Sequence, residues 1–97
     1  MSGGDWKQLF FACQKGDLEL VKFYIRSGID PNYQHPEFMT SPFLESIRCN
    51  QLDVAAFLLQ NGADPHRKEG FGADDAFSIA KSMKNKAAID LLKKMVP

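Results

Sequence analysis

The chain has 97 residues, a length that fits one domain, and its hydrophobic content of 44% is ordinary for a folded globular protein. Twelve basic and twelve acidic side chains cancel, so no large net field attracts nucleic acid or an anionic membrane surface. No apolar run approaches the roughly 18 residues needed to span a bilayer, and the N-terminus lacks the basic and apolar segments of a secretory signal.

The first part of the chain predicts two helices joined by a tight turn. Asp5 and Gln8 have the spacing of a capping box, and the helix that follows ends near Gly16, which tolerates a left-handed backbone. A second helix is expected from about Asp17 to Gly28, with apolar rows at 3.6-residue spacing. The apolar side of the first helix carries Leu9, Phe10, Ala12 and Cys13.

The middle of the chain repeats this arrangement after a connector at residues 32–40. Ser41 and Pro42 open a third helix as N-cap and first helical residue, and Asn50 ends it. A fourth helix follows and stops at Gly62. The chain therefore alternates helix, turn, helix and projecting loop.

The last part follows the same order with weaker signals. Residues 66–73 form a second connector, and Asp75 caps a fifth helix. The final segment, 84–97, carries apolar residues at helical spacing and predicts a sixth helix.

The segment GDLELVKFYIRSGIDPN at residues 16–32 recurs as NQLDVAAFLLQNGADPH at residues 50–66, a spacing of 34 residues. A fixed period of this length indicates stacked helical repeats. We expect one domain, 1–97, built of three units at about 5–31, 32–65 and 66–97.

These motifs resemble the ankyrin repeat family over nearly the whole chain. The middle unit reads Ser41-Pro42-Phe43, then NQLDV, then Leu-Leu, then Asn-Gly-Ala-Asp, where the family has thr-pro-leu, gly-his-leu-glu-ile-val, leu-leu and gly-ala-asp. Leu44 replaces the family's histidine, which argues against its usual side-chain hydrogen bonds between neighbouring loops.

The resemblance implies an all-α repeat, an α-solenoid of three stacked helix-turn-helix units. It also implies two β-hairpin-like finger loops at about residues 32–40 and 66–73. The tetratricopeptide family is the alternative fold, but it needs no glycine turn and long connector after every second helix.

Three lysines in the last unit predict a polar end to the array. Lys81, Lys86 and Lys93 stand where the earlier units have apolar residues. Terminal repeats need such a polar outer face, so we expect a three-repeat protein that ends here. We also expect it to be a monomer on its own.

No constellation of residues favours catalysis, a metal or a cofactor. His35, His66, Cys13 and Cys49 lack metal-ligand spacing, and the two cysteines occupy different repeat positions, which argues against a disulfide. Cys13 is expected in the core, and Cys49 at a more open position. We expect a reducing compartment and hence a cytoplasmic, intracellular protein, with the nucleus left open.

The resemblance implies that partners contact the finger tips and the open side of the first helix of each unit, which together form a concave surface. Exposed aromatic residues in the fingers and at the start of the first helix support this interpretation, because aromatic anchors are enriched in binding hot spots. Tyr33 is the aromatic residue expected to pack at a finger base. The candidate partner contacts are Trp6, Gln14, Lys15, Glu37, Phe38, Thr40, Arg48, Cys49, Phe71, Gly72, Asp74, Ser82 and Met83.

The favoured hypothesis is therefore a non-catalytic protein–protein interaction module, a small adaptor or regulatory subunit that binds another protein and neither nucleic acid nor membrane. One alternative is an enzyme or a small-molecule or metal-binding protein, which requires a converging set of polar groups. The other is nucleic-acid binding through the lysine-rich C-terminal end.

Overall fold

The computed structural model describes residues 3–70 and 72–96, and the described residues form six helices and no strand. The helices are α1 (Gly3–Lys15), α2 (Leu18–Arg26), α3 (Pro42–Arg48), α4 (Leu52–Gln60), α5 (Ala76–Ser82) and α6 (Lys86–Met95). The order confirms the predicted all-α repeat.

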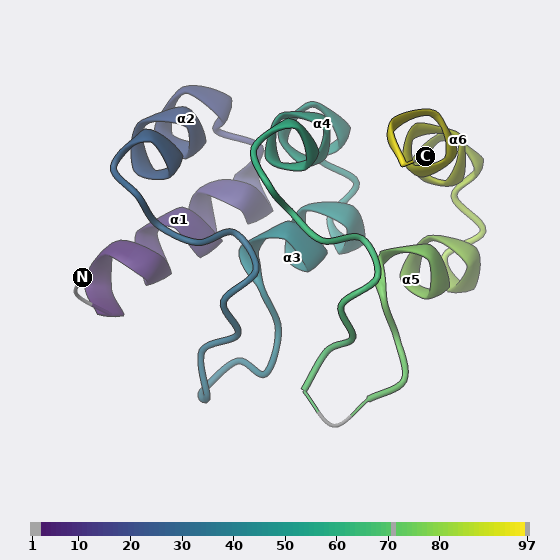
Figure 1. Cartoon of the computed structure of the whole chain (residues 1–97), viewed down its shortest axis with the longest axis horizontal. Coiled ribbons are helices and arrows are strands. Elements are labelled where there is room, and N and C mark those ends of the chain that lie inside the picture. The colour runs from purple at the N-terminus through teal and green to yellow at the C-terminus, as the bar shows by residue number, and fades with distance from the viewer. Residues whose placement is uncertain (1–2, 71, 97) are drawn as a thin grey trace.

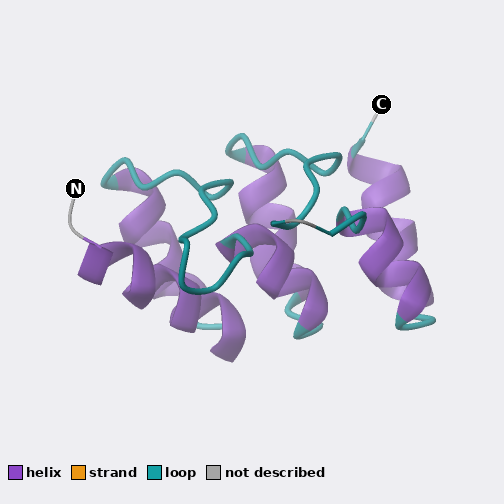
Figure 2. Cartoon of the chain, turned by 90° about the horizontal axis from the view of Figure 1, so that it is seen from below, coloured by secondary structure: helices purple, strands orange, loops and turns teal. Residues whose placement is uncertain are grey.

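The helices lie in two layers (Figure 1). One layer contains α1, α3 and α5, and the other contains α2, α4 and α6. Each helix contacts its partner in the pair and its equivalent in the next pair, as a stacked repeat requires. Seen from below, α1, α3 and α5 lie side by side in front of the second layer (Figure 2).

Short polar side chains begin four of the helices. Asp17, Ser41, Asp75 and Asn85 each accept a hydrogen bond from the backbone N–H three residues later. The predicted caps at Ser41 and Asp75 are thus confirmed. The capping box at Asp5 is wrong, because α1 begins at Gly3 and Asp5 lies inside its first turn.

The turns inside the helix pairs repeat one backbone conformation. Gly16, Asn50 and Lys84 have φ values of +79°, +57° and +54° and lie 34 residues apart. At Gly16 a Cβ atom would also meet the side-chain amide of Gln51, which would have to shift. The predicted helix ends at Gly16 and Asn50 are confirmed.

The core runs without interruption through both layers. It contains large apolar side chains from every pair, and the central helix α3 is buried at every position from Pro42 to Ile47. Cys13 is fully buried and Cys49 is half-buried, as expected. Lys81, Lys86 and Lys93 are exposed.

The two connectors project beyond the layer of α1, α3 and α5 (Figure 1), but neither contains a strand among the described residues. In the first, the backbone N–H groups of Phe38 and Met39 both donate to the carbonyl of His35, at 2.9 Å each. In the second, Glu69 N–H donates to Asp74 O at 2.9 Å. The expected hairpins are therefore turns rather than paired strands.

Candidate functional site

The two fingers, 32–40 and 66–75 without residue 71, and the exposed sides of α1, α3 and α5 form one surface, which we call the finger face. Three of the five large apolar side chains that are exposed in the described residues lie on it. They are Phe11 of α1, Met39 of the first finger and Met83 after α5, with exposed fractions of 41%, 37% and 40%.

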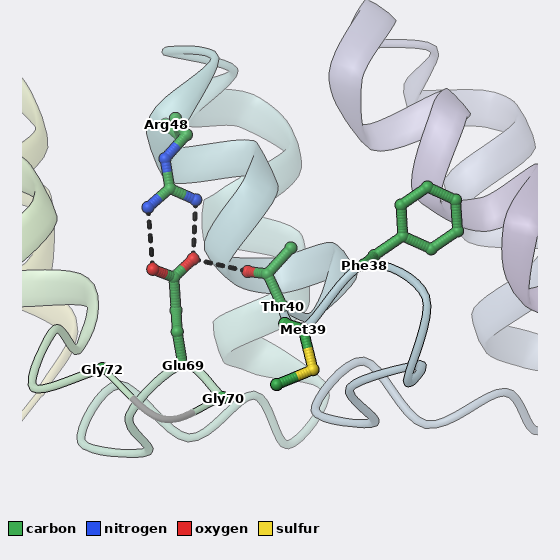
Figure 3. A pocket seen from close by; sticks show the side chains of 7 residues that line it. All are labelled: Phe38, Met39, Thr40, Arg48, Glu69, Gly70 and Gly72. Atoms are coloured by element: carbon green, nitrogen blue, oxygen red, sulfur yellow. Dashed lines mark hydrogen bonds and ion pairs between the residues drawn. The ribbon is translucent and has the colours of Figure 1, made fainter.

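An open hollow of about 400 Å³ lies between the fingers (Figure 3). Its lining combines apolar, charged and glycine residues: Phe38, Met39, Thr40, Arg48, Glu69, Gly70 and Gly72. Met39 has a left-handed backbone with φ of +58°, a conformation that L residues other than asparagine and aspartate seldom adopt.

A charged pair spans one side of the hollow (Figure 3). The guanidinium of Arg48 donates to both carboxylate oxygens of Glu69, at 2.6 and 2.9 Å. The hydroxyl of Thr40 donates to the same carboxylate at 2.7 Å. These three contacts attach the second finger to α3 and to the end of the first finger, since bidentate arginine pairs also fix orientation.

The pair shifts the pKa of both partners. Partial burial alone would raise the pKa of Glu69, but hydrogen bonds from Arg48 and Thr40 outweigh it and hold this pKa below its usual value. The hydrogen bond to Glu69 is the main reason that the pKa of Arg48 is raised.

We predict that Glu69→Gln lowers the free energy of unfolding by about 1 kcal/mol or less at neutral pH, because the pair is partly exposed to water. A folded-state pKa below the ordinary 4.5 stabilises the fold above that value, and the contribution is lost as the pH falls through the lowered pKa. Urea unfolding at pH 7 and at about pH 3 measures this loss. Glu37→Gln is the control, and an equal effect of Glu69→Gln at both pH values would contradict the prediction.

Glu45 of α3 is an acidic residue with only 7% exposure. Its carboxylate accepts from the side-chain amide of Gln14 at 2.7 Å and from the thiol of Cys49 at 3.7 Å. Arg48 lies 3.9 Å away. The sequence did not indicate this burial, although the equivalent positions one repeat before and after are the apolar residues Phe11 and Ile79.

Trp6 does not lie on the surface, so its expected exposure is wrong. Only 1% of it is exposed, and its ring nitrogen donates to Tyr33 O at 3.0 Å. Phe38 packs against it, with ring centroids 5.4 Å apart, and against Phe10 at 4.9 Å. The aromatic residue at the finger base is thus Phe38, half-buried, whereas Tyr33 is 49% exposed.

Two amide side chains of the first finger bond to the loop that follows α4, in place of the family's usual hydrogen bonds. The amide of Asn32 donates to Gly62 O at 2.9 Å and accepts from Asp64 N–H at 2.7 Å. The amide of Gln34 donates to Lys68 O at 2.7 Å and accepts from Gly70 N–H at 2.6 Å. Hydrogen bonds between neighbouring loops therefore form without the family's histidine.

Some of the remaining predicted partner contacts are exposed, and others form polar contacts within the molecule. Lys15, Asp74, Ser82 and Met83 are exposed, as is Gly72, whereas Phe71 lies outside the described residues. Glu37 is exposed and pairs with Lys7 at 3.2 Å. Gln14, Thr40, Arg48 and Cys49 belong to the polar contacts around Glu45 and Glu69.

The sequence interpretation missed Phe11, Met39 and Glu69 as parts of the finger face. For Phe11 a signal was available, because this residue falls outside the apolar side of the first helix. A phenylalanine in such a position is exposed unless a neighbouring element covers it.

Burial raises the pKa of the Cys13 thiol to about 12, with smaller contributions from Glu45 and Cys49. Burial also raises the pKa of Cys49. Both cysteines are free, and within residues 3–70 and 72–96 no group of three His, Cys, Asp or Glu side chains is arranged to hold a metal ion. None of the helices described is long and apolar enough to cross a membrane.

Comparisons with known proteins agree with this architecture. The family model for ankyrin repeats in many copies matches residues 9–59, which is more than half of the chain. The ankyrin domain of AnkB from Legionella pneumophila superposes with a TM-score of 0.76 at 25% identity, over 96% of this chain and 88% of that one.

Curated relatives include larger proteins. The mouse 2-5A-dependent ribonuclease is 33% identical over 69 residues, which is 71% of this chain and 9% of that protein. The BTB/POZ domain-containing protein 3 of Schizosaccharomyces pombe is 37% identical over 59 residues, 61% of this chain and 11% of that protein. The chain thus spans about a tenth of the length of these relatives.

The fold and its loops define a helical repeat protein of the kind that presents a binding surface. The chain belongs to the ankyrin repeat family. Members of this family are in general protein–protein interaction modules.

Proposed function

We propose that this chain is a non-catalytic adaptor or regulatory module that binds another protein through the finger face. The observation that carries the proposal is the exposure of Phe11, Met39 and Met83, which come from three different repeats and belong to the layer of α1, α3 and α5 or to the finger beyond it. Large apolar groups gathered on one surface are typical of an interaction site.

The finger face is also held in place before any partner arrives. Gln34 bonds the first finger to the second, and Asn32 bonds it to the turn after α4. Arg48 fixes the second finger to α3 through Glu69. A surface that is already ordered loses less conformational entropy on binding, which favours affinity.

The polar groups of the finger face support binding rather than chemistry. Three acids of the finger face, Glu45, Glu69 and the N-cap Asp75, are partly or fully buried, and each accepts hydrogen bonds from neighbouring donors. Among the described residues, every buried side-chain nitrogen and oxygen has a hydrogen-bond partner. Such groups position the surface and leave the apolar residues to make the contacts.

The test is capture of partner proteins from a cell lysate by the immobilised chain, with mass spectrometry as the readout. The double variant Phe11→Ser with Met83→Ser should weaken binding of the captured protein by about tenfold or more, as expected for hot-spot truncation. Phe23→Ser is the matched control, because Phe23 is an exposed phenylalanine on the opposite layer. Equal loss in the control, or no loss in the double variant, would reject the finger face.

A further inference from the structure

The outer face of the second layer, formed by α2, α4 and α6, carries an apolar row of its own. Phe23 is 59% exposed, the largest fraction among the exposed large apolar residues that the structure describes. Phe57 and Leu91 stand at the equivalent positions, 34 and 68 residues further on, and pack half-buried against the core. The ammonium group of Lys22 lies over the Phe57 ring, 5.9 Å from its centroid. The row therefore runs across the three parallel helices, on the layer opposite the finger tips (Figure 1).

Charged residues of opposite sign flank this row. Glu19 and Asp53, exposed in the first turns of α2 and α4, lie on its side toward the helix N-termini. Arg26 and Lys94, exposed in the last turns of α2 and α6, lie on the other side. Residues four or three positions apart share one side of a helix, so Glu19, Phe23 and Arg26 form one line along α2.

We propose that this outer face binds a second copy of the chain in a twofold symmetric dimer whose axis runs along the apolar row. Such a rotation places each helix antiparallel to its own copy and keeps the apolar row on the apolar row. It also places Glu19 of one copy opposite Arg26 of the other, twice in the dimer. The complementary charges and the antiparallel helix dipoles both favour this arrangement.

The charge pattern selects this axis over the other twofold axis in the same plane. An axis parallel to the helices and centred on α4 would set Asp53 against Asp53 and Arg26 against Lys94, and opposed like charges disfavour binding. A face with acidic residues on one flank and basic residues on the other is thus complementary to itself in one orientation.

The size of the face sets the expected strength. The molecule measures 34 Å along the array and 23 Å along its shortest axis, and these two extents bound the outer face (Figure 1). Their product is close to the roughly 800 Å² per partner of a standard interface. Because the apolar part is a single row, we expect a weak, reversible dimer with a dissociation constant in the micromolar to millimolar range. The finger face stays free, so this inference does not depend on the proposed function.

Sedimentation velocity over a concentration series from about 1 μM to 1 mM tests the dimer directly. The wild-type chain should shift from monomer to dimer across this range, and Phe23→Ser should weaken the dimer by about tenfold or more. Phe11→Ser, an equally drastic change on the finger face, should leave it unchanged. A chain that stays monomeric, or a dimer that loses as much from Phe11→Ser as from Phe23→Ser, would overturn the proposal.

Charge reversal tests the orientation with variants that leave the apolar row intact. Glu19→Arg and Arg26→Glu should each weaken self-association severalfold, whereas an equimolar mixture of the two should recover a mixed dimer. The double variant with both changes should dimerise as well as the wild type within about threefold, because it only exchanges the two charges of α2 and keeps opposite charges facing each other. Thermal unfolding verifies that each variant is folded. If neither the mixture nor the double variant regains dimer formation, the proposed axis is refuted.

Discussion

Replacing Trp6 by alanine is expected to lower the free energy of unfolding by about 3–5 kcal/mol, the usual cost of truncating a fully buried aromatic residue. The side chain packs against Phe10 and Phe38 and donates to Tyr33 O. Removing it therefore leaves a cavity between α1 and the first finger and an unpaired carbonyl. Since a domain of this kind is stable by only about 5–15 kcal/mol, chemical denaturation should show a large shift of the midpoint.

Trp6→Phe separates the two contributions, because it keeps an aromatic ring and removes the donor to Tyr33 O. Trp6→Phe should lower the free energy of unfolding clearly less than Trp6→Ala does. Phe23→Ala, at an exposed position, should lower it least. If Trp6→Ala costs no more than Phe23→Ala, Trp6 is not the buried anchor of the first finger.

Phe43→Ala should lower the free energy of unfolding about as much as Trp6→Ala, by roughly 3–5 kcal/mol, because Phe43 is fully buried in α3 at the centre of the array. The equivalent residue of the last pair, Phe77, is half-buried and stacks on His66 at 5.7 Å. Phe77→Ala removes the same atoms at the edge of the array, so its cost should be smaller.

Urea unfolding of the two variants provides a matched comparison of one repeat position in two environments. A stacked array predicts a larger loss at Phe43, since α3 packs against α1, α4 and α5, whereas α5 packs against α3 and α6. Equal losses would show that the position of a repeat within the array does not matter.

Most of the fold could be predicted from the sequence because its signals are local and periodic. Ser41 and Asp75 satisfy backbone N–H groups within one turn, and Gly16 and Asn50 adopt a left-handed backbone wherever the helix pair turns. Such effects depend on residues within four positions along the chain. The repeat spacing of 34 residues then determines which helices are neighbours.

The finger face was harder to predict because its geometry depends on contacts between repeats. Whether Trp6 is exposed depends on where Phe38 packs, and Phe38 lies in a loop without helical periodicity. The burial of Glu45 likewise depends on Gln14, which is 31 residues away. No local pattern encodes these pairings, so the aromatic residues could be identified as important without being assigned to core or surface.

Hydrogen bonds between neighbouring loops come from the first finger and do not require the family's histidine. The absence of histidine at Leu44 argued against the family's usual side-chain hydrogen bonds between neighbouring loops, and Asn32 and Gln34 of the first finger form others in their place. Such a bond needs a donor and an acceptor that reach the next loop, and the amide side chains of Asn32 and Gln34 carry both.

Hydrogen exchange of the chain in complex with the protein it captures tests the proposed binding surface most directly. Bound partner should slow exchange in the two fingers and at the C-terminal ends of α1, α3 and α5, where Phe11, Met39 and Met83 are exposed. Exchange in α2, α4 and α6 should change little on partner binding. Protection confined to these three helices, with both fingers exchanging as fast as in the free chain, would contradict the account.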